Sequence, residues 1–162
     1  MTFGSVAGAM EMAAGAYQAA LEAVGDLPVR VLLTVGHGAN LDAFAGGSPN
    51  VRVEHWVSQH DVLARAAAVV CHGGSGSTLG ALAAGLPIVV VPLFADQPND
   101  AKRVGVIVAP EPHAIRDGLS QVLANESYRA AVESLAAEMR SNPAIDTAVE
   151  TLAVLARPPG SA

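Results

Sequence analysis

The stretch Cys71-His72-Gly73-Gly74-Ser75-Gly76-Ser77-Thr78 separates two apolar segments of the chain. The segment before it, 67–71 (AAVVC), is predicted to be a buried strand, and 78–85 (TLGALAAG) is predicted to be a helix packed closely on a sheet. A glycine-rich turn between a strand and a helix exposes backbone N–H groups where the helix starts, and these can hold a phosphate without a lysine. The stretch therefore predicts a nucleotide-binding site.

The rest of the chain alternates between predicted strands and helices. Predicted strands cover 29–35, 51–55, 67–71, 87–93 and 106–108, and predicted helices cover 10–24, 61–66, 78–84, 113–124, 127–140 and 144–156. The strands are apolar throughout rather than alternating, which is typical of a parallel sheet with helices on both faces. We therefore expect an α/β, Rossmann-like three-layer domain.

Ligands of such domains bind at the carboxyl ends of the strands. Three candidate loops follow predicted strands there: Gly4-Ser5, 72–77 and 94–97. Their convergence on one edge of the sheet favours a single binding site over three unrelated turns.

Composition limits the remaining possibilities. The 162 residues are 51% hydrophobic and 15% charged, as expected for one globular domain. The net charge is −6 and the basic residues are scattered, which argues against a nucleic-acid partner. No apolar run approaches the ~20 residues of a membrane span. A single cysteine and the lack of a signal-peptide pattern predict a reducing, cytoplasmic location.

Common nucleotide and catalytic motifs fit the glycine-rich stretch poorly. No lysine follows the glycines, which excludes a Walker A loop. The dinucleotide-binding motif G-x-G-x-x-G also does not fit, because Gly74 and Gly76 are followed by Gly80, one residue too late for its third glycine. The nucleophile-elbow motif of hydrolases, G-x-S-x-G, does not fit either, because Ser77 occupies the position of its last glycine. A triad of Ser75, Asp96 and a histidine stays open as an alternative.

Metal binding has little support in the sequence. His55, His60 and His72 do not have metal-ligand spacing, and Cys71 within a strand is more simply a core residue. We expect no metal and no cofactor.

Several short motifs, taken together and in order, resemble one known signature. They are Trp56-Val57-Ser58-Gln59, Val62-Leu63, His72 to Ser77, Ala83-Ala84-Gly85-Leu86-Pro87, Pro92 and Asp96-Gln97. Their order is similar to the donor-sugar signature of the UDP-glycosyltransferase-like family with the GT-B fold, in particular its actinobacterial natural-product and macrolide branch. The resemblance runs from about Phe3 to Leu155.

The resemblance covers only the C-terminal half of such an enzyme. It implies a nucleotide-sugar donor domain over 1–156. The residues 157–162 (RPPGSA) are predicted from their composition to form a disordered tail. It further implies an inverting transfer of a hexose from a UDP- or dTDP-sugar to a small acceptor. The general base would lie in an N-terminal acceptor domain, so this chain alone should transfer little or nothing. Two alternatives stay open: a separate binding subunit of a split glycosyltransferase, and a fragment of a GT-B epimerase.

The resemblance also implies roles for individual residues. Trp56 would stack on the base, His72 would donate to the diphosphate, and Asp96 with Gln97 would bind the hydroxyls of the sugar. The full set implied to contact the donor is Gly4, Ser5, Trp56, Val57, Gln59, His72, Gly73, Gly74, Ser75, Gly76, Ser77, Asp96 and Gln97.

Simpler roles exist for several of these residues. Trp56 could be a packing residue, Asp96 a helix cap, and Gly73 and Gly74 necessary only for backbone geometry. His37, His55, His60 and His113 are assigned no role.

Three positions depart from the family pattern. Many members carry a glutamate that holds ribose hydroxyls where this chain has Gly80. The glycine would either suit a deoxythymidine nucleotide or be a tolerated packing change. Ser58 replaces the usual proline, and the segment 102–106 is shorter than in most members.

Overall fold

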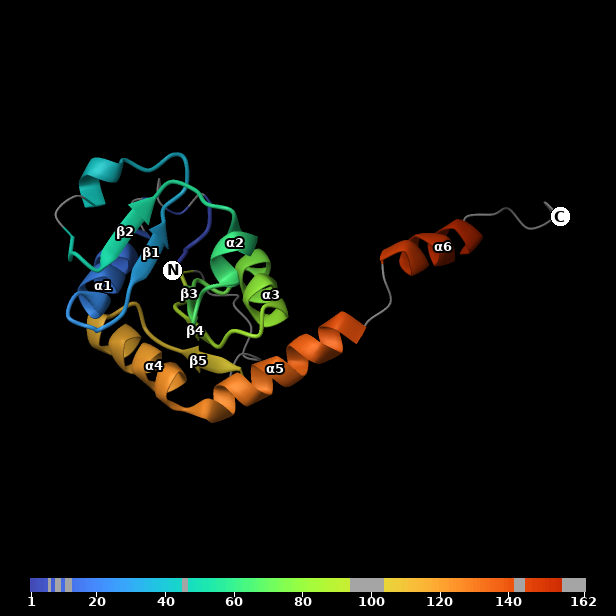
Figure 1. Cartoon of the computed structure of the whole chain (residues 1–162). Helices are drawn as coiled ribbons and strands as arrows, with labels where there is room; N and C mark the ends of the chain where they lie inside the picture. Colours follow the sequence, from blue (N-terminus) through green and yellow to red (C-terminus); the bar gives the residue numbers. More distant parts are fainter. Residues whose placement is uncertain are drawn as a thin grey trace.

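A parallel β-sheet forms the middle of the molecule (Figure 1). The computed structural model describes residues 1–5, 7, 10, 13–44, 47–93, 104–141 and 145–155. Its named strands are β1 (Val31–Thr34), β2 (Val51–Glu54), β3 (Val69–Cys71), β4 (Ile88–Val90) and β5 (Gly105–Ile107). β1 pairs with β2, and β4 pairs with both β3 and β5, all in parallel. The predicted parallel α/β fold is thereby confirmed.

The first residues of the chain join the two groups of strands. Thr2 makes parallel bridges to Thr34 of β1 and to Cys71 of β3. Its N–H donates to the carbonyl of Val70 at 2.9 Å, and the N–H of Thr34 donates to the carbonyl of Met1 at 3.0 Å. The sheet therefore runs in the order β2, β1, Met1–Phe3, β3, β4, β5.

Helices cover both faces of this sheet (Figure 1). The helical segments are α1 (Ala14–Val24), a 3₁₀ turn (Leu41–Phe44), α2 (Gln59–Leu63), α3 (Ser75–Ala83), α4 (Pro112–Ala124), α5 (Glu126–Ser141) and α6 (Ile145–Leu155). Helices α1 and α4 pack on one face, while α2, α3 and α5 pack on the other. Helix α6 lies away from the sheet and exposes Val149, Leu152 and Val154.

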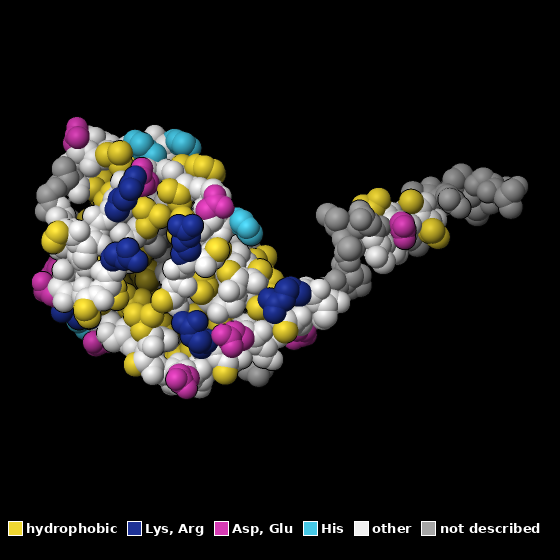
Figure 2. Space-filling view, viewed as in Figure 1, with side chains coloured by type: hydrophobic (Ala, Val, Ile, Leu, Met, Phe, Trp, Pro, Cys, Tyr) yellow, Lys and Arg dark blue, Asp and Glu magenta, His cyan; other side chains and the backbone are white. Residues whose placement is uncertain are grey.

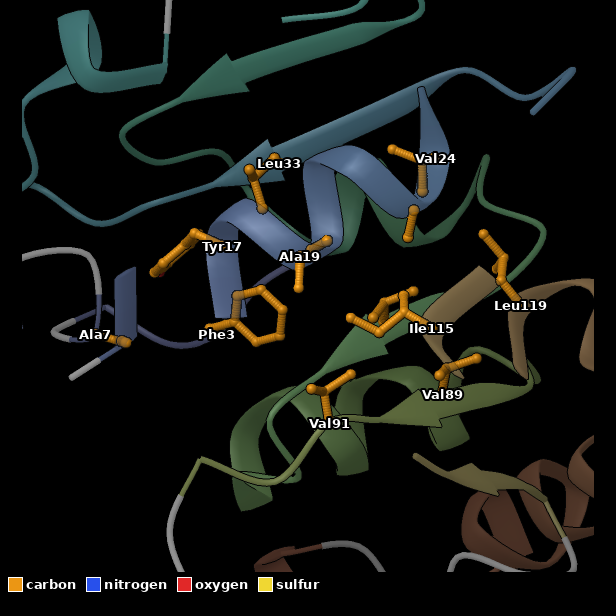
Figure 3. Packing of buried hydrophobic residues seen from close by; sticks show 14 of the residues in the cluster. Phe3, Ala7, Tyr17, Ala19, Val24, Leu33, Val89, Val91, Ile115 and Leu119 are labelled. Atoms are coloured by element: carbon orange, nitrogen blue, oxygen red, sulfur yellow. The ribbon is translucent and has the colours of Figure 1, made fainter. Parts of the chain in front are cut away.

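Side chains of β3 and β4 alternate between two hydrophobic clusters. Val70 and Val89 point towards α1 and α4, whereas Cys71 and Val90 point towards α3 and α5. This alternation is the two-residue period of a strand whose faces are both buried. Figure 3 shows Phe3 and Tyr17 in the first cluster, and their rings meet edge to face at 5.0 Å.

Element boundaries differ from those predicted by a few residues. Helix α3 begins at Ser75 rather than Thr78, because the last part of the glycine-rich turn is already helical. Helix α1 begins at Ala14 and leaves Met10 outside it, and α2 covers 59–63 instead of 61–66. Strand β4 ends at Val90, three residues before the predicted end. Gly85 follows α3 with a φ of +70, a left-handed conformation that is common in the residue directly after a helix.

Within the described residues, no helix is both long enough and apolar enough to cross a bilayer. The predicted tail, 157–162, lies outside the described part of the chain, so its disorder stays a prediction.

Candidate functional site

A pocket of about 240 Å³ lies beside the first residues of the chain and reaches the carboxyl edge of the sheet. Six of the predicted donor-binding residues contribute to its wall: Gly4, Ser5, Trp56, Val57, Gln59 and Ser77. They come from three separate segments that follow strands or begin α3. The predicted convergence of the Gly4-Ser5 turn and the glycine-rich turn on one edge is therefore confirmed.

The imidazole of His72 is held between two glycines next to this pocket. A Cβ atom on Gly4 would lie 3.2 Å from Cε1 of His72, and one on Gly74 would lie 2.7 Å from the same atom. Gly4 also has a φ of +97, a conformation that other residues rarely adopt. Both glycines are thus needed for the close approach of the ring, and not only for the turn.

The two ring nitrogens of His72 differ in their surroundings. Nδ1 is buried and has no hydrogen-bond partner among the described residues. Burial lowers the pKa of His72 below its ordinary value, so the ring is neutral near pH 7. Because Nδ1 is buried, Nε2 is the ring nitrogen that we expect to contact a ligand.

Helix α3 starts directly after Gly74, which is its N-cap residue. The first hydrogen bond of the helix runs from the N–H of Thr78 to the carbonyl of Gly74 at 3.0 Å. The amides of Ser75, Gly76 and Ser77 precede this bond and form the positive end of the helix dipole. This end of the helix is suited to an anion, as the sequence predicted.

The segment between β2 and α2 supplies the mouth of the pocket. Trp56 is 63% exposed although it is a large aromatic residue, so packing does not account for its position. Val57 and Gln59 follow it along the pocket wall. An exposed indole at the mouth of a pocket offers a flat apolar surface on which a base can stack.

Gly80 lies under the carboxamide of Gln59. A Cβ atom on Gly80 would come within 2.8 Å of Nε2 of Gln59. The space that a larger side chain would take at Gly80 is therefore occupied by Gln59 from α2. This contact between helices could not be read from the separation of the two residues in the sequence.

Two histidines without an assigned role also line the pocket. The rings of His37 and His55 stack with their centroids 6.4 Å apart, and Nδ1 of His55 lies 3.0 Å from the carbonyl of Gly36. Gly36 has a φ of +83 and a side chain there would meet the backbone of Ser5. Each histidine comes shortly after a strand of the sheet. Its position in the sequence could therefore have predicted that it lies at the carboxyl edge.

Several predicted residues lie beside the pocket or outside the described chain. His72, Gly73, Gly74, Ser75 and Gly76 are adjacent to the pocket but are not part of its wall. Asp96 and Gln97 lie outside the described residues, so their contact with a sugar stays a prediction.

By residue type, Cys71 and the acidic side chains of the described residues are possible metal ligands. Cys71 is fully buried in β3, which confirms it as a core residue, and burial raises the pKa of its thiol. In the parts of the chain that the structure describes, no three His, Cys, Asp or Glu side chains gather closely enough to hold a metal ion.

Comparison with known families accounts for most of the chain. Residues 18–155 match a family described as erythromycin biosynthesis protein CIII-like, C-terminal domain. The chain belongs to this family. The match includes most of α1, the Trp56 segment and the glycine-rich turn, and it confirms the resemblance to antibiotic glycosyltransferases.

Related proteins and structures agree with this assignment. The elloramycin glycosyltransferase of Streptomyces olivaceus is 38% identical over 123 residues, which are 69% of this chain and 32% of that protein. The calicheamicin glycosyltransferase structure superposes with a TM-score of 0.81 at 28% identity, covering 96% of this chain and 41% of the other. The structure of the glycosyltransferase VinC in complex with dTDP superposes with a TM-score of 0.74 at 26% identity, and the superposition covers 94% of this chain and 39% of VinC. The fold is therefore that of one half of a GT-B glycosyltransferase, and the chain spans about a third of the curated relative's length.

Proposed function

We propose that this chain binds a nucleoside-diphosphate sugar as the donor half of an inverting glycosyltransferase. The observation that carries this proposal is the His72 ring, clamped between Gly4 and Gly74 beside the first turn of α3. Nε2 and the amides of the helix start are the donors that a diphosphate requires. Trp56 stands at the pocket mouth, where a base could stack.

The comparisons support a nucleotide at this edge. VinC was solved with dTDP, and the elloramycin and calicheamicin proteins are named as glycosyltransferases. For this chain, both UDP- and dTDP-sugars are consistent with the site. The absence of a side chain at Gly80 favours a nucleotide that needs no ribose 2′-hydroxyl contact.

The site is suited to stabilise the leaving group of sugar transfer. When the bond to the anomeric carbon breaks, negative charge increases on the β-phosphate. Fixed N–H donors and a helix N-terminus oppose that charge without rearranging, and losing one such donor typically raises a barrier by about 3 kcal/mol. We propose that His72 and the α3 amides fill this role without a metal ion, while Asp96 and Gln97 hold the sugar.

The acceptor and the general base are proposed to belong to a second, N-terminal domain. Relatives about three times as long as the matched segment support this arrangement. The exposed Val149, Leu152 and Val154 of α6 are also the kind of apolar surface that packs against another domain. By itself the chain is expected to bind the donor and to transfer hexose to a small-molecule acceptor weakly or not at all.

Titration calorimetry with UDP and dTDP, in buffer containing EDTA, tests the proposal. Replacing Trp56 by Ala should weaken binding by about 1–3 kcal/mol because stacking is lost. His72→Ala should weaken it by a similar amount because a hydrogen bond to a charged group is lost.

Leu79→Ala is the matched control for Trp56→Ala, because Leu79 is also a large exposed residue (54%) but does not line the pocket. It should leave nucleotide binding unchanged. A nucleotide affinity that is unchanged in both the Trp56→Ala and the His72→Ala variant would contradict the proposed donor site. Binding that requires a divalent metal ion would also contradict it.

A further inference from the structure

The Gly4-Ser5 turn at the carboxyl edge is enclosed from two sides. On one side, Gly4 lies against the ring of His72, whose Cε1 atom would be 3.2 Å from a Cβ atom on Gly4. On the other side, Ser5 lies against the backbone of Gly36. A Cβ atom on Gly36 would overlap the carbonyl oxygen of Ser5 and lie 2.8 Å from its carbonyl carbon. The position of Gly36 therefore limits where the peptide of Ser5 can lie.

Gly36 is held in turn by His55. It lies beyond Thr34 and Glu54, the last paired residues of β1 and β2, so the regular ladder does not fix its position. The N–H of Gly36 donates to the carbonyl of His55 at 2.9 Å, and the carbonyl of Gly36 lies 3.0 Å from Nδ1 of the same histidine. The N–H of Ala39 also donates to the carbonyl of Gly36, at 3.3 Å. His55 thus contacts both backbone polar groups of Gly36.

The contact with Gly36 determines the tautomer of His55. A carbonyl oxygen can only accept a hydrogen bond, so Nδ1 carries the hydrogen and Nε2 of the neutral ring does not. The ring is half-buried and lines the pocket beside His37. Figure 2 shows two neighbouring His side chains at the top of the molecule, where the chain leaves β1 and β2 in Figure 1. His55 is therefore a residue of the pocket rim with one ring nitrogen bonded to the backbone.

We propose that His55 is a positioning residue for donor binding, because its Nδ1–H holds Gly36 against the peptide of Ser5 and so keeps the Gly4-Ser5 turn beside His72. The inference rests on the donor site proposed above and adds a residue to it. His55 acts on the nucleotide through Gly36 and Ser5. Groups that meet a ligand need such support from a surrounding layer of hydrogen bonds to stay in a productive geometry.

The hydrogen bonds at Gly36 separate this role from a general role in folding. The bond from Gly36 to the carbonyl of His55 and the bond from Ala39 to Gly36 use only backbone atoms, so they are kept whatever side chain stands at position 55. A substitution of His55 therefore removes only the bond from Nδ1. Gly36 is then held less firmly while the sheet below it is unchanged. The effect should fall on ligand binding rather than on stability.

Asparagine and glutamine at position 55 distinguish the hydrogen bond from other properties of the ring. The amide nitrogen of asparagine is at the δ position, like Nδ1 of histidine, so His55→Asn can keep the donation to Gly36. The amide nitrogen of glutamine is one bond further along the side chain, so His55→Gln cannot place it at the same point. Both side chains are neutral and polar, so a difference between the two variants reports the position of the donor.

Calorimetry with UDP and dTDP measures the effect on binding. His55→Gln should weaken nucleotide binding roughly three- to tenfold, as expected for the loss of one hydrogen bond, whereas His55→Asn should stay within about twofold of the unchanged chain. The thermal unfolding midpoints of the two variants should agree within about 2 °C. Equal affinities of the Asn and Gln variants would overturn the positioning role.

His113→Gln is the matched control for His55→Gln. His113 is an exposed histidine on α4 and does not line the pocket. Its substitution should leave the affinity for both nucleotides unchanged. A loss of affinity as large as that of His55→Gln would show that the hydrogen bond to Gly36 is not the cause.

Two measurements without nucleotide separate this inference from the proposed function. Nitrogen NMR of the unchanged chain near neutral pH should show the ring of His55 protonated at Nδ1, and protonation at Nε2 alone would overturn the inference. The amide resonances of Ser5 and Gly36 should shift in His55→Gln and stay nearly in place in His55→Asn, and equal shifts in both would also overturn it. If the unchanged chain binds neither nucleotide, the proposed function is wrong, and the NMR measurements still decide whether His55 holds the turn.

Discussion

The two ends of the pocket are built on different principles. At the carboxyl edge, the wall consists of turns and exposed side chains, and its close contacts depend on Gly4, Gly36 and Gly74. At the amino edge, the wall consists of strand and helix residues such as Leu32, Leu63 and Val69. The first end resembles a ligand site, and the second is an apolar wall built from packed secondary structure. The two ends can therefore be changed separately by substitution.

At the carboxyl edge, Gly74→Ala should have the largest effect on the ligand site. The new methyl group would displace the His72 ring, which lies too close to accommodate it. We expect the dissociation constant for UDP or dTDP to increase roughly 30-fold, or about 2 kcal/mol, because the contacts of His72 with the diphosphate are lost. Calorimetry measures this change.

Gly15→Ala is the matched control, because a Cβ atom at Gly15 in α1 would meet no other atom. It should stabilise the chain by up to about 1 kcal/mol and leave nucleotide binding unchanged. If both substitutions weakened binding equally, the close packing of His72 would not be the cause.

The pH dependence of donor binding should show a smaller effect. Burial lowers the pKa of His72 in the free chain, whereas a bound diphosphate favours the imidazolium. Binding therefore takes up a proton, and affinity for UDP-glucose or dTDP-glucose should increase severalfold between about pH 7.5 and pH 5.5. The stability of the chain without ligand should change in the opposite direction. The pKa of His72 is lower in the folded chain than in the unfolded chain, so the unfolded chain takes up the proton first as the pH falls. His72 therefore contributes less to the free energy of unfolding in acid.

His72→Gln separates this effect from other titrating groups. The variant keeps a donor for the diphosphate but has no proton to take up, so its affinity should be nearly independent of pH. An unchanged increase at low pH in this variant would rule out His72 as its source.

The smallest effect is expected at Gly80. Gly80→Glu would push the flexible end of Gln59 aside and introduce the carboxylate that the family resemblance implies at this position. We expect a change of less than about 1 kcal/mol in the free energy of unfolding and a severalfold shift in preference from dTDP towards UDP. Parallel titrations with the two nucleotides measure the shift.

Gly80→Ala displaces Gln59 in the same way without adding a carboxylate. If the Ala and Glu variants changed the preference equally, Gln59 rather than the missing carboxylate would determine it.

The sequence was sufficient for the fold class and for placing the Gly4-Ser5 turn and the glycine-rich turn at the carboxyl edge. Apolar runs such as 67–71 and 87–93 carry the signal of strands buried on both faces, and the turn at His72 to Ser77 carries the signal of an anion site at a helix start. These features are local in the chain, so composition and spacing reveal them. The boundaries of α3 were less predictable, because serine and glycine are compatible with both a turn and the first turn of a helix.

Only the tertiary structure decided which residues meet across the pocket. That Gly4 and Gly74 enclose one imidazole and that Gln59 covers Gly80 both depend on contacts between distant segments. The sequence by itself determined the pattern of buried strands, because burial of apolar residues is encoded position by position. The geometry of the site depends on sheet register and helix packing, and those follow from the whole chain folding together.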